Sequence, residues 1–245
     1  MNQLVSATQP DLGDKIMLVT GAGDGIGKAV AIECGRLGAT VILLGKTVKK
    51  LEATYDALVE AGAPQPAIYP MNFEGASADD FDQLANTVDE NFGRLDGLFN
   101  NIGWHGACAP LELFDIELWY KVMQVNLNAP FMLTRACIPL VRKSSAGSIV
   151  FNTDEKATAY WGAYGIAKAG IDRLSAIVGD ELENEGVCVN AFDPGAVRSG
   201  LRKRAFPGED SSGLATPDDV AKYFVSLLSG EIASQQRVLK AEDFS

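Results

Sequence analysis

Short apolar runs alternate along the chain with longer segments whose apolar residues recur every three or four positions. The runs have the length and character of strands buried on both faces of a sheet, and they span residues 16–19, 40–44, 67–71, 95–99, 148–151 and 187–192. The periodic segments predict helices at residues 26–37, 48–61, 77–92, 115–143, 159–185 and 217–228. Because strand and helix alternate without two strands in succession, the pattern predicts an α/β fold with a doubly wound parallel sheet.

Polar residues at the segment ends support several of these boundaries. Ser77 and Asp80 form a capping pattern before the third helix, and Thr216 precedes Pro217 at the start of the last one. Pro130 and Pro139 lie inside the segment 115–143, where we expect kinks or breaks.

The last third of the chain is less regular. Residues 196–215 are first basic and then rich in glycine and serine, with no clean period, so we expect a mobile substrate loop over the strand ends. Residues 237–240 predict one more edge strand. We interpret residues 1–245 as one domain, with residues 1–14 as an N-terminal extension.

Composition narrows the class of protein. The 245 residues include 32 Asp and Glu against 21 Lys and Arg, a net charge of −11, which argues against a nucleic-acid surface and against anionic membranes. The four cysteines are widely spaced, and the N-terminus lacks the basic start and apolar core of a signal peptide. We therefore expect a cytoplasmic protein with reduced thiols.

A glycine-rich turn joins the first strand to the first helix. It reads Thr-Gly-Ala-Gly-Asp-Gly-Ile-Gly over residues 20–27. Glycine permits positive φ and close approach of a ligand, and the N–H groups that open a helix have no partner within it. Strand, tight turn and helix together predict a phosphate-binding site.

Tyr164 and Lys168 stand four residues apart on one predicted helix, which places both side chains on the same face. A neighbouring ammonium favours the phenolate and would lower the pKa of the tyrosine from its usual value near 10. Tyr164 would then exchange a proton with a carbonyl oxygen that receives hydride. A metal site is not expected, since His105 is the single histidine and no Cys-x-x-Cys pair occurs.

Together these motifs resemble the short-chain dehydrogenase/reductase family over residues 15–224. They occur in the family's order as Thr20 to Gly27, Asn100-Asn101-Ile102-Gly103, Asn126, Tyr164 with Lys168, and Pro194-Gly195. Ile102 replaces the family's usual alanine, and Ser199 stands where a threonine is usual.

The resemblance implies a Rossmann-type sheet of about seven strands in the order 3-2-1-4-5-6-7. It also implies a nicotinamide-dependent oxidoreductase that acts on a carbonyl or secondary alcohol. Tyr164 would be the acid/base, Lys168 its partner, and Asn126 would hold a proton-relay water. The implied cofactor-binding residues are Gly21, Asp24, Gly25, Ile26, Gly27, Lys46, Asn72, Asn100, Gly103, Tyr164, Lys168, Pro194, Gly195 and Val197. Family members usually pair through their two long helices, so we expect a homodimer or homotetramer.

The second predicted strand indicates which cofactor binds. An NAD enzyme carries an acidic residue about 20 residues past the glycine turn, at the end of this strand. Here Lys46 follows Gly45 and no acid is present, which favours NADP over NAD. Asp24 argues the other way, because NADP-binding relatives often carry a basic residue there. Asn72 replaces the aspartate that commonly faces adenine and still offers hydrogen bonds.

One element of the family pattern is missing. A serine that hydrogen-bonds the reacting oxygen normally follows the fifth strand, but residues 151–160 contain none. Thr153 keeps a hydroxyl and could take this role, whereas Asp154 would bring negative charge toward Tyr164 and oppose the chemistry unless protonated. We expect Thr153 in the serine role and an enzyme that is weak. The alternative is a dinucleotide-binding sensor or scaffold with little turnover.

Three other groups of residues have both a functional and an ordinary structural interpretation. His105 follows Asn101 closely, but a surface loop is the favoured interpretation. Trp161 lies one helical turn before Tyr164 and is a candidate for substrate contact. The basic run Arg202-Lys203-Arg204 could attract an anionic substrate, although such runs are more often solvated.

Overall fold

A six-stranded parallel sheet forms the centre of the protein. We analysed a computed structural model, which describes residues 10–156 and 158–244. Within them the strand order is β3-β2-β1-β4-β5-β6. The strands are β1 (Ile16–Thr20), β2 (Thr40–Gly45), β3 (Ala67–Pro70), β4 (Gly97–Asn100), β5 (Gly147–Asn152) and β6 (Val187–Phe192). Every pairing is parallel, which confirms the predicted doubly wound fold.

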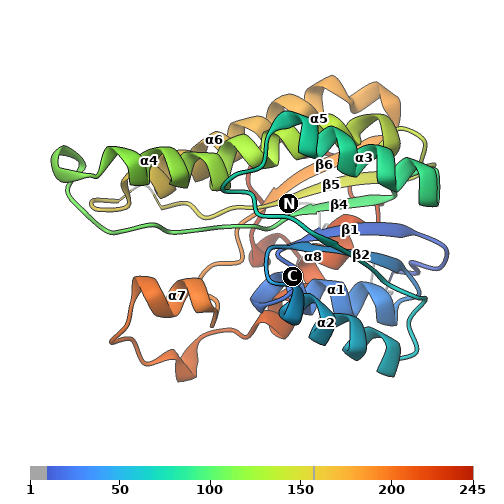
Figure 1. The fold of residues 1–245 in the computed structure, drawn as a ribbon, viewed down its shortest axis with the longest axis horizontal. Coiled ribbons are helices and arrows are strands. Elements are labelled where there is room, and N and C mark those ends of the chain that lie inside the picture. The colour runs from blue at the N-terminus through green and yellow to red at the C-terminus, as the bar shows by residue number, and fades with distance from the viewer. Residues whose placement is uncertain (1–9, 157, 245) are drawn as a thin grey trace.

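Helices cover both faces of this sheet (Figure 1). One layer contains α1 (Gly25–Arg36), α2 (Val48–Glu60) and α8 (Pro217–Leu228). The other contains α3 (Ala78–Phe92), α4 (Ile116–Met123), α5 (Ala129–Val141) and α6 (Gly162–Glu181). The short helix α7 (Gly200–Ala205) projects from one end, near α4.

Two hydrophobic cores follow from this layering. Met17 and Val19 of β1 belong to the core beneath α1 and α8, whereas Leu18, between them, belongs to the core beneath α3 and α5. Side chains alternate across a strand, so a strand covered on both faces must be apolar throughout. This explains why the strands appear in the sequence as continuous apolar runs.

Local signals define several helix ends. Ser77 and Asp80 form the expected capping box at α3, and Thr216 and Asp219 form another at α8. Gly93 ends α3 with φ of 73°, in the left-handed region where glycine carries no steric cost.

The expected long helix 115–143 is divided. A π-helical turn, Gln124–Asn128, separates α4 from α5, and the Ala129 N–H donates to the carbonyl of Gln124. Pro130 follows directly and has no N–H to continue the α-helical ladder. The π-helical turn therefore lies just before Pro130, one of the two prolines at which a kink or break was expected.

Two further expectations needed correction. Among the described residues the seventh strand is reduced to one parallel bridge between Phe192 and Leu239, because the chain turns into a 3-10 helix at Ala241–Phe244. The substrate loop is also more ordered than expected: Val197 bridges to Ala215, and the loop contains α7, which is too short for its period to be recognised. Residues 1–9 of the expected extension lie outside the described residues.

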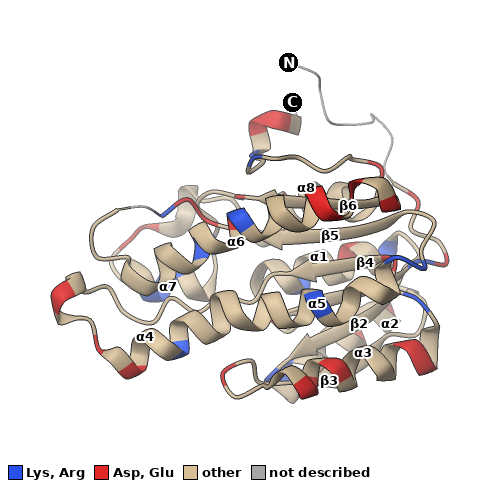
Figure 2. Ribbon diagram, turned by 90° about the horizontal axis from the view of Figure 1, so that it is seen from above, with Lys and Arg blue, Asp and Glu red and all other residues tan. Residues whose placement is uncertain are grey.

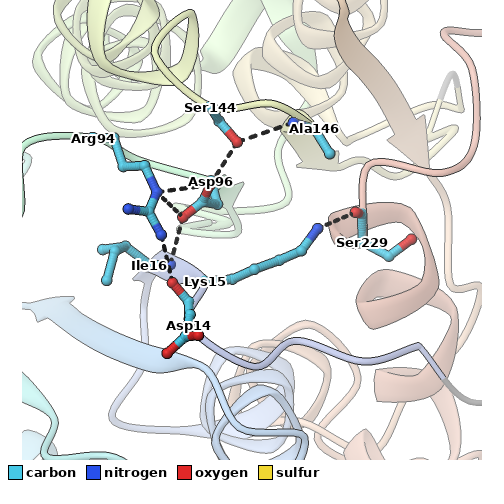
Figure 3. A network of polar contacts seen from close by, with 8 residues as sticks. All are labelled: Asp14, Lys15, Ile16, Arg94, Asp96, Ser144, Ala146 and Ser229. Atoms are coloured by element: carbon cyan, nitrogen blue, oxygen red, sulfur yellow. Dashed lines mark hydrogen bonds and ion pairs between the residues drawn. The ribbon is translucent and has the colours of Figure 1, made fainter.

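Asp96 joins the amino ends of three elements (Figure 3). Its buried carboxylate accepts the Ile16 N–H at 2.8 Å, the Ser144 hydroxyl at 2.5 Å and Arg94 Nε at 3.0 Å. The contact connects β1 with the turn that precedes β5.

Asp96→Ala should lower the free energy of unfolding by about 2–4 kcal/mol, because it leaves a buried N–H and a guanidinium without their acceptor. The control is Asp82→Ala, which removes an exposed ion pair with Arg135 and should cost less than about 1 kcal/mol. Equal losses in urea denaturation would contradict the role given to Asp96.

Candidate active site

A cleft opens where the carboxyl ends of β1, β4, β5 and β6 meet α7. This edge is where open parallel sheets bind ligands. The cleft has a volume of about 280 Å³. Most of the predicted site residues line it, namely Gly21, Asp24, Gly25, Ile26, Gly103, Thr153, Tyr164, Lys168, Pro194, Gly195 and Val197.

The glycine turn forms one wall and is shaped for close approach. Gly21 and Gly25 have φ of 66° and 50°, which few other residues adopt. A Cβ on Gly27 would lie 2.3 Å from the carbonyl oxygen of Gly21, so any side chain there would push the turn and α1 apart. The turn is a backbone cradle of the kind that holds a pyrophosphate.

Asp24 caps the first helix beside this cradle. Its carboxylate accepts the Gly25 N–H at 2.8 Å and pairs with Lys50 at 2.5 Å. The hydrogen bond from Lys50 holds the pKa of Asp24 below its usual value. Lys50 therefore offsets the charge that argued against a 2′-phosphate.

A second hollow of about 300 Å³ lies against Gly21 and the end of β2. Lys46 and Asn72 line it together with Gly103, and both side chains are exposed. The structure thus brings the two residues expected at the adenosine end into one hollow, which shares Gly21 and Gly103 with the main cleft.

Tyr164 and Lys168 lie side by side on α6, and each is only 4% exposed. Lys168 Nζ donates to the carbonyl of Asn152 at 2.8 Å and lies 5.8 Å from the centre of the Tyr164 ring. Burial lowers the pKa of Lys168 to about 8. Burial also raises the pKa of Tyr164 well above 10, which reverses the expected effect of the lysine.

The group that faces the Tyr164 hydroxyl is a carboxylate. Tyr164 donates to Asp154 Oδ2 at 3.3 Å. Asp154 and the more distant Asp193 add to the rise in the Tyr164 pKa, because both disfavour a phenolate. Burial in turn raises the pKa of Asp154, while Lys156, 3.4 Å from its other oxygen, opposes that rise.

Thr153 does not take the expected serine role in this structure. Its hydroxyl is 2% exposed and donates to Asp172 Oδ1 at 2.5 Å, away from the tyrosine. The Thr153 N–H donates to the carbonyl of Phe192, so this residue continues the β5–β6 pairing. Strand alternation then turns the neighbouring Asp154 toward Tyr164.

Asn126 anchors the loop that follows β4. Its Oδ1 accepts the Trp104 N–H at 2.9 Å, and its Nδ2 donates to the Trp104 and Val122 carbonyls at 2.8 and 2.7 Å. The Val122 carbonyl lies within reach because the π-helical turn interrupts the helix there. The role of Asn126 toward a proton-relay water stays a prediction.

Asn100 was expected to bind the cofactor, but its side chain does not line the cleft. Asn100 Nδ2 donates to Thr134 on α5, at 3.1 Å, and its buried side chain is turned from the cleft. Asn101 lines the cleft instead and accepts the Asn152 side chain at 2.9 Å. The two adjacent side chains point to opposite sides of the backbone, and the sequence motif alone does not tell which of them faces the cleft.

Aromatic residues close the far end of the site. His105 is 6% exposed, and its ring centre lies 5.0 Å from that of Trp161 and 6.1 Å from that of Tyr164, so the surface-loop interpretation was wrong. Trp161 lines the cleft, as does Phe206 just beyond α7.

The basic run on α7 is only partly solvated. Arg202 pairs with Glu209 at 2.6 Å and lies over the Phe206 ring at 4.2 Å. Figure 2 shows the Lys and Arg residues of α7 at the same end of the molecule as α4. Arg202 and Arg204 both line the cleft, whereas Lys203 lines a separate hollow behind α7.

Comparison with known proteins agrees with this geometry. The family model for short chain dehydrogenases matches residues 15–210. The chain belongs to the short chain dehydrogenase family.

Relatives of this family cover nearly the whole chain. The Escherichia coli (strain K12) oxidoreductase YciK is 38% identical over 223 residues, which make up 90% of this chain and 88% of the relative. A short chain dehydrogenase structure from Pseudomonas syringae has a TM-score of 0.92 and 39% identity, covering 96% of this chain and 98% of the other. One from Shigella flexneri 2a, complexed with NADP, has a TM-score of 0.91 and 36% identity and covers 96% and 100%.

Among residues 10–156 and 158–244, the helices lack the combined length and apolar character that a transmembrane span needs.

Thr153→Val should lower stability by about 1–3 kcal/mol at pH 8, because the Asp172 carboxylate loses a hydrogen bond. Burial raises the pKa of Asp172 and the bond from Thr153 lowers it, so the variant's folded-state pKa should rise further. An acid with a raised folded-state pKa loses stability as pH increases, so the loss should be smaller near pH 4.

The control is Thr87→Val, which removes an exposed hydroxyl that donates to the Gln83 carbonyl on α3. Denaturation of both variants at the two pH values measures the difference. A Thr153→Val loss that does not change with pH would exclude the Asp172 contact as its cause.

Proposed function

We propose that this protein is an NADP(H)-dependent oxidoreductase that adds hydride to a polar double bond or removes it from the reduced form, with a carbonyl and its secondary alcohol as the general pair. The observation that carries the proposal is the buried Tyr164–Lys168 pair at the end of a glycine-walled cleft. The family membership and the NADP in the similar Shigella flexneri structure support it.

The residues of the cleft fit a dinucleotide. The glycine turn would receive the pyrophosphate, Lys46 the 2′-phosphate, and Asn72 the adenine. The walls beyond the turn, which include Ile102, Gly103, Pro194, Gly195 and Val197, would receive the nicotinamide half. Lys50, already paired with Asp24, would keep that carboxylate from repelling a 2′-phosphate.

The chemistry would divide between cofactor and protein. Bound NADPH supplies a hydride, which no side chain can provide. Tyr164 would exchange the proton with the substrate heteroatom, and the Lys168 ammonium would favour the phenolate once it forms. Asn126 would keep the loop after β4 in place through its bonds to Trp104.

A binding protein with little turnover is the second candidate. The Tyr164–Asp154 contact favours it, because a carboxylate beside the phenol raises its pKa and opposes negative charge on a reacting oxygen. Such a protein would still bind the dinucleotide through the glycine turn and Lys46.

We also propose a cytoplasmic homo-oligomer assembled through α4, α5 and α6. Large apolar side chains are exposed on these helices, namely Ile116, Tyr120, Phe131, Ile166 and Ile177. Exposed apolar area of this kind is typical of a surface that pairs with another copy. A monomer in sedimentation at micromolar concentration would exclude this assembly.

Tyr164→Phe should lower turnover at least about 10²-fold on any carbonyl substrate while NADPH binding stays within about twofold, because only the proton donor is lost. The measurements are NADPH oxidation at 340 nm against a carbonyl panel and cofactor titration. If the parent protein binds NADPH tightly but turns over nothing on the panel, carbonyl reduction is excluded and the binding-protein candidate gains support.

Lys46→Ala should weaken NADPH binding about tenfold or more and leave NADH binding unchanged, because it removes one charge-assisted bond to the 2′-phosphate. Lys49→Ala, on the first turn of α2, is the control for lost positive charge. Equal weakening of both cofactors, or tighter binding of NADH by the parent protein, would contradict the assignment.

A further inference from the structure

One contact of Tyr164 opposes the build-up of negative charge on a reacting oxygen, namely the contact with Asp154. Hydride addition to C=O places negative charge on oxygen, so the reacting atom needs donors or cations around it. Here the Tyr164 hydroxyl donates to the Asp154 carboxylate, at 3.3 Å. The other charge that raises the Tyr164 pKa is also a carboxylate, that of Asp193.

A cation already lies at this position within the chain. The Lys156 ammonium is 3.4 Å from Asp154 Oδ1 and 5.8 Å from the centre of the Trp161 ring. The carboxylate and the indole face together therefore accommodate a positive group at the reacting end of the cleft. Lys156 is tethered to the loop after β5 and only partly buried, so a ligand could displace it.

Two other positive groups near the cleft have hydrogen-bond or ion-pair partners of their own. Lys168 donates to the Asn152 carbonyl, and Arg202 pairs with Glu209. Both still act on Asp154 through space, since Lys168 lowers the pKa of that carboxyl and Asp154 raises the pKa of Arg202. The charged group in hydrogen-bond contact with the tyrosine hydroxyl is therefore the Asp154 carboxylate.

We propose that the preferred substrate is a cationic imine, with Asp154 pairing with its C=N⁺ group and Trp161 contacting its apolar body. This inference rests on the proposed function for the cofactor and hydride transfer, and names the substrate class. A carboxylate stabilises a transition state that keeps part of a positive charge, whereas it destabilises one that develops negative charge.

The reaction balances without a proton in the transfer step. The iminium carbon gains a hydride and forms a C–H bond, and the π pair of C=N becomes the lone pair of a neutral amine. The nicotinamide is oxidised as the substrate is reduced. In the reverse direction the amine loses hydride, and Asp154 stabilises the positive charge that develops on nitrogen.

The first test compares N-methyl-3,4-dihydroisoquinolinium, a permanent C=N⁺ cation, with the neutral ketone 1-tetralone of similar shape. With NADPH, and after subtraction of the uncatalysed reaction, kcat/KM should be at least about tenfold higher for the cation. In Asp154→Ser the ratio should fall about tenfold or more, and ketone reduction should increase. Asp56→Asn, exposed on α2, is the control for lost negative charge.

The second test measures binding and needs no turnover. Calorimetry on the protein saturated with NADP compares 2,2-dimethyl-tetrahydroisoquinolinium with its neutral carbon analogue 2,2-dimethyl-tetrahydronaphthalene. Asp154→Asn should weaken binding of the cation about tenfold and leave the neutral analogue unchanged. Lys156→Met should strengthen binding of the cation, because it removes the internal competitor.

The outcomes separate the two proposals. Turnover of the ketone at or above that of the cation, or a ratio unchanged in Asp154→Ser, would overturn the imine assignment and leave the oxidoreductase intact. Cation binding that depends on Asp154 without turnover of either probe would support a cationic ligand and refute the oxidoreductase. Cation binding that is equally tight in the parent protein, Asp154→Asn and Lys156→Met would overturn the inference.

Discussion

Burial of both sheet faces is the constraint on which the rest of the structure depends. Helices must cover the two faces, so a ligand can reach the strands only at their ends. At the amino ends, Asp96 ties Ile16 to Ser144 and closes the edge with polar bonds. At the carboxyl ends, the glycine turn, the loop after β4 and the segment Asn152 to Lys156 meet instead. The site therefore lies where the chain leaves the sheet.

That position explains the electrostatics of the site. Tyr164 and Lys168 come from a helix that packs on the sheet, so both are buried, and burial dominates the pKa shift of each. Once water is largely excluded, the next nearest group decides the chemistry. In this chain that group is Asp154, two residues beyond β5, and in the imine proposal it sets the charge that the reacting atom can carry.

Features carried by local sequence could be predicted, and those that depend on register could not. The alternating elements, the capping pair Ser77 and Asp80, and the glycine turn follow from neighbouring residues alone. The choice between Thr153 and Asp154 depends on which of the two continues the pairing with Phe192, a contact 39 residues away in sequence. The bridge at Leu239 and the six residues of α7 give too short a pattern to recognise.

An acidic residue paired with a lysine lies at each end of the cleft. Each end has an acidic side chain that would repel an anionic ligand group. Asp24 lies beside the phosphate cradle and Asp154 beside Tyr164, and each is paired with a lysine. Lys50 is on α2 and donates to Asp24 at 2.5 Å, so the ionised carboxylate and the ammonium together carry little net charge. Lys156 is on a loop and lies 3.4 Å from Asp154, a longer contact that a cationic substrate could replace. Because Lys50 stays on Asp24 whereas Lys156 can leave Asp154, the proposals give this chain of net charge −11 an anion site at one end of its cleft and a cation site at the other.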